Sequence, residues 1–226
     1  MKKKIILSSL AAGLALFSYT ALAGLSPGTK AASTDPVEPP YSNTIEKNSL
    51  FKKLIVEDAN DDGFTWYFLG GTAHNRYNWQ DKTIPADDYL FTPGISLEKN
   101  AKYVFEADVN NGFSTTRARV GFVVATAPEH TAVVSTIMAP RLFTQSPDKW
   151  EHCSGEFIAP EKGVYYFGVW DCSDANGYGP SVKNITVSAP VFMDGPAAVS
   201  DLKAVSDPNG NLSVVLTYTC LLKTSY

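Results

Sequence analysis

Hydrophobic and polar residues alternate with a period of two through much of the chain after residue 41. In residues 102–109, KYVFEADV, the odd-numbered side chains are apolar, and three of the four even-numbered ones are polar. This alternation is typical of β-strands with one buried side and one solvent-facing side. Strand-like composition continues in four later segments, at 118–126, 151–159, 163–170 and 181–189.

Turn-forming sequences separate these segments, among them NNG, SPDK, PEKG and SDANGYG. Short strands separated by frequent turns are typical of β-sandwiches and jelly rolls. After the first 23 residues, no segment of ten or more residues shows the 3.6-residue apolar period of a helix. We therefore predict an all-β fold, a jelly-roll β-sandwich.

The N-terminal residues 1–23 have the order of features found in a secretory signal peptide. Three lysines precede an apolar run from Ile5 to Tyr19, and Ala21 and Ala23 form a small-residue cleavage motif. The alternative, a buried N-terminal helix, does not account for this order. Residues 24–41 are rich in Pro, Ser, Thr and Gly and are predicted to be a flexible linker, so that the jelly-roll domain covers 42–189.

The charge and hydropathy of the chain restrict the classes of partner that it can bind. The whole chain has a net charge of −4, and removal of the signal peptide takes away three of its 19 Lys and Arg, leaving 16 basic and 23 acidic side chains and a charge of −7. An acidic protein without basic clusters is a poor nucleic-acid binder. No later stretch approaches the roughly 20 apolar residues of a membrane helix. These features predict a secreted or bacterial cell-surface protein.

Four segments, taken in order, resemble a known family. They are DANDDGFTWYF, DDYLFTPGISLEKNAKYVFEADV, WEHCSGEFIAPEKGVYYFGVW and GPSVKNITVSA. Together they are similar to the choice-of-anchor J or cleaved-adhesin domain, the jelly roll of bacterial surface proteins and of gingipain haemagglutinin-adhesin regions. The resemblance covers residues 42–189. It implies a domain that serves adhesion or ligand binding and has no catalytic activity of its own.

The remaining residues, 190–226, are predicted to be a linker and part of a second module. The segment PAAVSDLKAVSDPNGNLSVVLTYT is similar to the first two strands of a fibronectin type III domain. It departs from that pattern at the final CLLKTSY, and two strands are marginally stable alone. We therefore expect an incomplete immunoglobulin-like module here.

The sequence VEDANDDGFTW suggests a calcium loop. The acidic or amide residues Asp58, Asn60 and Asp62 stand at alternate positions before Gly63. Their side chains can supply oxygen ligands to calcium on a tight turn. The EF-hand pattern fails because Leu69 occupies the position of its bidentate Glu, so further oxygens must come from elsewhere. The alternative is that the same side chains only cap a turn. The candidate ligands for a structural calcium ion are Asp58, Asn60, Asp62, Asp87 and Asp88.

The long segment 70–88 is the predicted ligand surface, because long connections in compact domains are often functional. Aromatic side chains there can stack on a sugar ring or on an apolar patch of a partner, and polar ones can bind hydroxyl groups. The alternative is that Trp79 plugs one end of the sandwich. The candidate residues are Asn75, Arg76, Tyr77, Trp79 and Tyr178, and the expected partner is carbohydrate or a host or matrix protein.

No catalytic residues are predicted. The chain has no G-x-S-x-G motif, and Glu106 with Asp108 lacks the arrangement of facing acids that a glycosidase needs. Two other functions remain open: an accessory domain of a secreted hydrolase, and a structural spacer. Cys153 and Cys172 are either disulfide-bonded or free thiols, and the sequence leaves both open.

Overall fold

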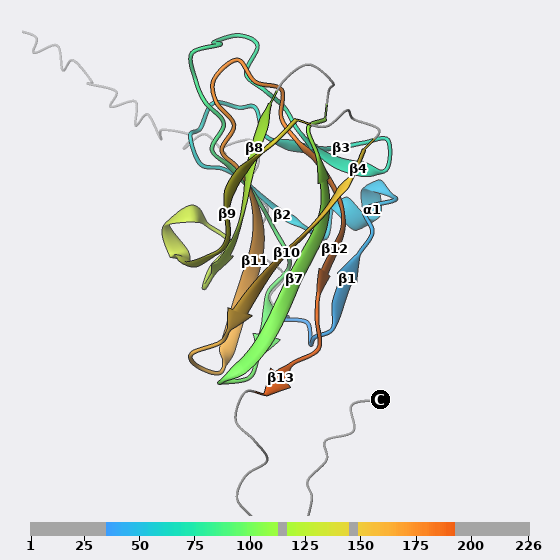
Figure 1. Cartoon of the computed structure of the whole chain (residues 1–226), viewed down its shortest axis with the longest axis vertical. Coiled ribbons are helices and arrows are strands. Elements are labelled where there is room, and N and C mark those ends of the chain that lie inside the picture. The colour runs from blue at the N-terminus through green and yellow to red at the C-terminus, as the bar shows by residue number, and fades with distance from the viewer. Residues whose placement is uncertain (1–34, 113–116, 145–148, 193–226) are drawn as a thin grey trace, which may run out of the picture.

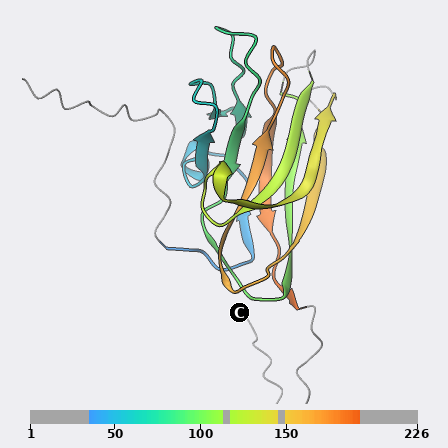
Figure 2. The same ribbon diagram turned by 90° about the vertical axis from the view of Figure 1, so that its left-hand side faces the viewer.

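The computed structural model describes residues 35–112, 117–144 and 149–192. Two antiparallel sheets face each other and form a sandwich (Figures 1 and 2). The prediction of an all-β jelly roll is confirmed. In these residues the helices are two short turns, α1 (Asn48–Phe51) and the 3₁₀ helix η1 (His130–Ala132), and neither is long enough to cross a membrane.

The first sheet has the strand order β10-β7-β12-β4-β3, with β1 added beside β12 and β13 beside β7. Its strands are β1 (Tyr41–Asn43), β3 (Trp66–Leu69), β4 (Thr72–Asn75), β7 (Ala101–Asn110), β10 (Glu151–Ile158), β12 (Ser181–Val187) and β13 (Val191–Phe192).

The second sheet has the order β2-β5-β11-β8-β9, with β6 added beside β11. Its strands are β2 (Ile55–Asp58), β5 (Asp88–Phe91), β6 (Ile95–Leu97), β8 (Ala118–Ala125), β9 (Val133–Phe143) and β11 (Gly163–Asp171). The five strands predicted from alternation correspond to β7, β8, β10, β11 and β12.

The main core lies between the sheets and follows from the alternation in β7. The side chains of Tyr103, Phe105 and other odd-numbered residues of this strand are fully buried, and those between them face outward. Phe105 packs edge-to-face on Phe122 of the opposite sheet, with ring centroids 4.9 Å apart, and stacks on Phe167 at 5.5 Å. Aromatic contacts across the two sheets therefore hold them together.

A second, smaller cluster covers the outer face of the second sheet. Tyr89 stacks between Phe91 and Trp170, each with a ring centroid 5.7 Å away. Trp170 is half-buried, and its indole N–H donates to a carboxylate oxygen of Asp87 at 2.8 Å. Trp170 in β11 therefore packs against the outer cluster of the second sheet and does not belong to the main core between the sheets.

The sandwich begins earlier than the predicted boundary at residue 42. Val37 forms a parallel bridge with Ile95, and Tyr41 is the first residue of β1. The predicted linker 24–41 therefore ends in paired backbone. The predicted signal peptide and the fibronectin-like segment lie outside the described residues. Cys153 and Cys172 are free thiols.

Candidate functional site

The predicted ligand segment begins in regular structure. Residues 70–88 were expected to be one long loop, but β4 lies inside them and pairs with β3. The turn between the two strands consists of Gly70 and Gly71, both with positive φ angles of 57° and 86°, a backbone conformation that glycine adopts without steric cost. This hairpin fixes the start of the ligand segment, and the loop proper runs from residue 76 to 87.

The loop after β4 lies beside the loop that joins β11 to β12, at one end of the sandwich (Figures 1 and 2). Side chains of the two loops meet where Tyr77 and Tyr178 pack with ring centroids 4.5 Å apart. Together with the β3–β4 hairpin, the loops enclose a cleft of about 200 Å³. The lining residues, which we call the aromatic cleft, are Tyr67, His74, Arg76, Tyr77, Trp79 and Tyr178.

The structure therefore brings together four of the five predicted ligand residues. Trp79 is 49% exposed and packs edge-to-face on Phe64 at 4.4 Å, so one edge is fixed while much of the ring remains open to solvent. This exposure favours a binding surface over the alternative of a buried plug. Arg76 is exposed, and its guanidinium lies 4.6 Å from the ring centre of Tyr67 and 6.0 Å from that of Trp79.

The fifth residue, Asn75, is not on this surface, and the prediction for it is wrong. Asn75 is the last residue of β4 and is fully buried. Its side-chain amide donates to Asp88 at 2.9 Å and to Asp171 at 2.7 Å. Because a strand directs successive side chains to opposite faces, Asn75 points into the sandwich while Arg76 points out.

The buried carboxyl groups below the cleft form a network of their own. Burial raises the pKa of Asp88 to about 8, and the nearby charge of Asp171 adds to this effect. Burial also raises the pKa of Asp171 to about 6, although Ser173 donates hydrogen bonds to it. One oxygen of Asp88 is buried without a hydrogen-bond partner among the described residues. Asp88 therefore favours its protonated form in the folded protein.

The predicted calcium loop folds as a capped turn. One carboxylate oxygen of Asp58 accepts the backbone N–H of Gly63 at 2.8 Å, and the other accepts that of Asp62 at 3.2 Å. Asn60 accepts the same Asp62 N–H, and Asp62 accepts that of Phe64 at 2.7 Å. These contacts match the turn-capping alternative. Within the described residues no three His, Cys, Asp or Glu side chains are placed to hold a metal ion, so calcium binding here stays a prediction.

The two acids predicted to complete that site point in different directions. Asp88 lies directly opposite Asp58 in the pairing of β2 with β5, but its carboxyl group is 1% exposed and contacts Asn75. Asp87 accepts the indole N–H of Trp170 on the outer face of the sheet. The structure therefore does not bring Asp87 and Asp88 together as a pair of ligands.

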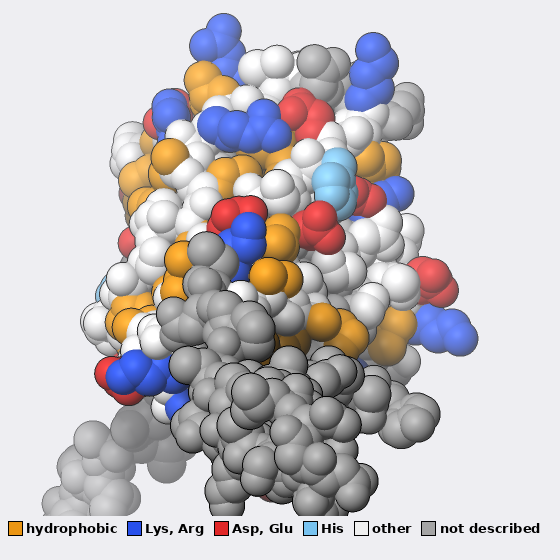
Figure 3. Space-filling model, turned by 60° about the horizontal axis from the view of Figure 1, so that its bottom comes forward, with side chains coloured by type: hydrophobic (Ala, Val, Ile, Leu, Met, Phe, Trp, Pro, Cys, Tyr) orange, Lys and Arg blue, Asp and Glu red, His pale blue; other side chains and the backbone are white. Residues whose placement is uncertain are grey.

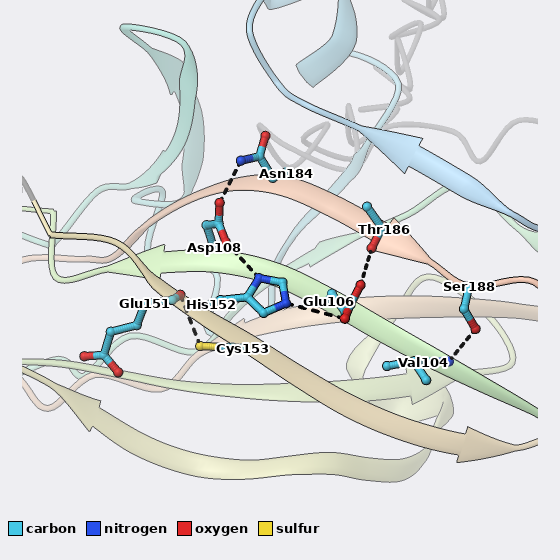
Figure 4. Close-up of polar contacts among 9 residues, drawn as sticks. All are labelled: Val104, Glu106, Asp108, Glu151, His152, Cys153, Asn184, Thr186 and Ser188. Carbon is cyan, nitrogen blue, oxygen red and sulfur yellow. Dashed lines mark hydrogen bonds and ion pairs between the residues drawn. The ribbon is translucent and has the colours of Figure 1, made fainter.

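A polar cluster lies on the outer face of β7, β10 and β12 (Figure 4). His152 lies between two acids, with its Nδ1 atom 3.0 Å from Asp108 and its Nε2 atom 3.4 Å from Glu106. Asn184 donates to Asp108 at 2.7 Å, and Thr186 donates to Glu106 at 3.1 Å. The hydrogen bond with Asp108 is the largest cause that raises the pKa of His152.

With the lower end of the molecule forward, acidic and basic side chains are interspersed over the described surface, and hydrophobic ones form scattered spots between them (Figure 3). The aromatic cleft, at the other end, is the place where exposed rings converge.

Two cleft residues were not predicted from the sequence. Tyr67 sits in a strand of four apolar residues, where nothing distinguishes an outward ring from a core ring. His74 is 4% exposed and contacts Ser181 at 2.8 Å. Neither residue carries a motif, and only the pairing of β4 with β3 and β12 places them at the cleft.

The geometry can be compared with that of known proteins. No protein-family model and no curated protein matches the sequence. Among solved structures, the chain is similar to the K1 cleaved adhesin domain of Lys-gingipain from Porphyromonas gingivalis, with a TM-score of 0.51 and 14% identity over 67% of this chain and 98% of that domain. The K3 cleaved adhesin domain of the same protein gives a TM-score of 0.47 and 13% identity over 61% and 91% of the two chains.

A third similar structure is the CBM22-1 xylan-binding domain from Paenibacillus barcinonensis Xyn10C, with a TM-score of 0.39 and 13% identity over 71% of this chain and 99% of that domain. At these identities the likeness concerns the fold. The described part of the chain has the jelly-roll fold of the K1 cleaved adhesin domain.

Proposed function

We propose that this chain is an exported, non-catalytic binding module that takes a carbohydrate ligand in the aromatic cleft. The observation that carries the proposal is the exposure of Trp79 at the rim of a cleft whose other lining residues are tyrosines, a histidine and an arginine. Ligand sites are concave, lined by aromatic side chains and provided with a few polar groups, and this cleft has those properties. The export signal predicted from residues 1–23 supports a location outside the cell.

The lining of the cleft supports binding over hydrolysis. Glycoside hydrolysis uses two carboxyl groups on either side of the scissile bond. None of the residues lining the cleft is an acid. The nearby Asp88 and Asp171 are buried and hydrogen-bonded to Asn75.

The size of the cleft supports a carbohydrate over a matrix protein. Stable protein–protein interfaces bury about 800 Å² on each partner, which requires a broad surface. A cleft of about 200 Å³ bordered by single exposed rings suits one or two sugar rings instead.

The test is binding of the purified chain to an array of glycans and matrix proteins, with Trp79→Ala and the matched control Trp150→Ala. Trp150 is half-buried beneath Lys183 on a sheet face and does not line the cleft. We expect specific glycan binding that Trp79→Ala weakens by about 10- to 30-fold, as for a buried aromatic anchor, while the control binds normally.

If Trp79→Ala and Trp150→Ala bind glycan equally well, the aromatic cleft is not the binding site. If the chain binds neither glycans nor matrix proteins, the alternative of a structural spacer is favoured. Binding to matrix proteins alone would favour a protein adhesin. Turnover of a glycoside or peptide by the purified chain would instead show a hydrolase.

A further inference from the structure

The charge inside the aromatic cleft differs in sign from that of the protein. Arg76 is the only Lys, Arg, Asp or Glu among the lining residues, whereas the whole chain carries a net charge of −4. Burial, with a smaller contribution from the charge of Arg76, lowers the pKa of His74 to about 4. His74 is therefore neutral at pH 7, and a single fixed positive charge faces the ligand.

The guanidinium of Arg76 is held by rings and not by acids. It makes no ion pair with any described residue, and it lies over the ring of Tyr67 and near that of Trp79. Stacking on an aromatic face fixes the plane of the guanidinium and leaves the N–H groups at its edge for other partners.

Three acids, Asp62, Asp88 and Asp174, line the small cavity next to the cleft, and each has a partner other than Arg76. Asp88 is buried and accepts a hydrogen bond from the side chain of Asn75. Asp62 accepts hydrogen bonds from the backbone of Phe64 and the side chain of Asn78. Asp174 lies 3.5 Å from the guanidinium of Arg119. The charge of Arg76 is thus not neutralised by direct pairing within the described structure.

We infer that the aromatic cleft selects an anionic sugar, in which a carboxylate or sulfate group binds the edge of Arg76 while the sugar ring packs on Trp79. The inference rests on the proposed carbohydrate-binding function. A planar guanidinium binds a carboxylate or sulfate through two parallel hydrogen bonds, which a neutral hydroxyl cannot match in strength. A neutral sugar would bury Arg76 without giving its charge a partner, at a cost in affinity.

The test is calorimetric titration of the full chain with two matched pairs of probes. One pair is oligogalacturonate and the same oligosaccharide with methyl-esterified carboxyl groups. The other is a sulfated galactan oligosaccharide and its desulfated form. We expect the anionic member of at least one pair to bind about 10- to 100-fold more tightly, the range of a charge-assisted pair. The pair that responds distinguishes a carboxylate ligand from a sulfate ligand.

The variants assign this preference to one side chain. Arg76→Gln should abolish the preference for the anionic member, and Arg76→Lys should keep only part of it because a lysine lacks the planar pair of donors. The control Lys82→Gln removes one positive charge from the same loop outside the cleft lining and should change neither affinity by more than about twofold. Thermal melting of each variant checks its fold.

The outcomes separate the inference from the function on which it rests. Equal affinity for both members of each pair, lost in Trp79→Ala, would keep carbohydrate binding and refute the anionic preference. A preference that survives Arg76→Gln would also refute it, since the charge would then lie elsewhere. Absence of binding to all four probes, together with silence on the glycan array, would refute the carbohydrate function itself.

Discussion

Single buried acids control how the stability of this protein depends on pH. The pKa of Asp88 is about 8 in the folded protein and near 3.8 in an unfolded chain. Between these values the folded protein binds more protons than the unfolded one, so the contribution of Asp88 to stability falls as pH rises from about 4 to about 8. At neutral pH this residue is therefore a cost to folding.

We predict that Asp88→Asn raises the free energy of unfolding relative to wild type, with a gain that grows from pH 4 to pH 8 to on the order of 5 kcal/mol. An amide keeps an acceptor for Asn75 and never becomes charged. Chemical denaturation at a series of pH values measures the gain. Asp87→Asn, one residue earlier and half-buried, is the matched control. A variant less stable than wild type at pH 8 would contradict this account.

His152 has the opposite pH dependence. Its folded-state pKa is raised by the hydrogen bond with Asp108 (Figure 4). Its stabilising contribution is therefore complete below the unfolded pKa of about 6.5 and is lost as pH rises through the folded value. Because the side chain is 62% exposed, solvent weakens the ion pair.

We predict that His152→Gln destabilises the protein at pH 5 by no more than about 1 kcal/mol and has a smaller effect at pH 9. Denaturation at the two pH values, each at low and high salt, measures the difference. Screening should reduce the effect at pH 5. A loss of the same size at both pH values would show that the side chain acts through packing and not through its charge.

The sequence indicates which residues are candidates for a ligand surface, but it does not show whether each side chain is exposed or buried. Arg76, Tyr77, Trp79 and Tyr178 were recognised because aromatic and basic residues in long loops are conspicuous. Asn75 looks the same in the sequence, but the end of β4 turns it inward. The faces of residues near a short strand depend on where the strand stops, and a four-residue strand gives too little alternation to show this.

Among the elements, the loop between β2 and β3 is stabilised by its own side chains. Asp58 accepts two backbone N–H groups, from Asp62 and Gly63. We predict that Asp58→Ala lowers the free energy of unfolding by about 0.5–2 kcal/mol, the range of a lost side-chain cap. Denaturation of wild type and variant in the presence of a chelator measures this loss. The control is Asp61→Asn, because Asp61 has a φ of 54° and asparagine tolerates this left-handed conformation better than alanine does. No loss in the variant would show that the turn forms without this cap.

The same variant tests the calcium prediction. If the loop binds calcium, adding the ion must raise the melting temperature of wild type, because a ligand stabilises the state that binds it. The increase should disappear in Asp58→Ala, which removes a predicted ligand. A wild-type melting temperature that is the same in calcium and in chelator would leave the loop as a turn only.

The position of the loop between β11 and β12 requires Gly179, because the backbone of this residue lies close to the backbone of Asn75. A methyl group added at this position would lie 2.4 Å from the backbone oxygen of Asn75. We predict that Gly179→Ala displaces the loop, separates Tyr178 from Tyr77 and weakens glycan binding by about tenfold or more. Titration with the best ligand of the array measures the effect, and Gly163→Ala, where the nearest atom is 3.6 Å away, is the control. Unchanged binding would show that the position of Tyr178 does not matter.

The strand β7 was predictable because it presents four or more alternating buried positions, and β8, β10, β11 and β12 were predictable from their strand-like composition between turn sequences. The edge strand β9 was not identified from the sequence. Most of its residues are partly or fully exposed, Pro140 lies within it, and its pairing with β8 contains three register irregularities. A bulged edge strand with one open side loses the regular apolar period. The short strands β2 to β6 are also not visible in the sequence. The strands β2, β5 and β6 pair with partners distant in the chain, and β3 and β4 form a hairpin of only four residues on each side.

For the molecule as a whole, alternation and turns were sufficient to predict a sandwich, and the structure confirms it. They could not predict which loops meet at one end. The cleft combines β3, β4, the loop 76–87 and the loop before β12, segments about 100 residues apart in the chain. Their meeting follows from the placement of β12 between β7 and β4, which local sequence does not encode.

The strand β7 connects the two ends of this sandwich. Its first residue, Ala101, pairs with Phe192 near the end of the described chain, and its last, Asn110, pairs with Ser181, which in turn pairs with His74 of the cleft. Val37, at the other end of the described chain, pairs with Ile95. Both ends of the described chain, near residues 37 and 192, therefore lie at the end of the sandwich opposite the cleft (Figure 1).

This arrangement determines how the module responds to mechanical force. The loop that holds Tyr178 continues directly into β12 and β13, so a pull between a ligand in the proposed cleft and Phe192, the last described residue, acts along β12 and loads its hydrogen bonds to β4 and β7 in shear. A pull between Val37 and Phe192 acts at one end of the sandwich and opens the pairs of β1 and β13 one after another. We therefore expect the described domain to withstand much greater tension through a ligand in the proposed cleft than between Val37 and Phe192.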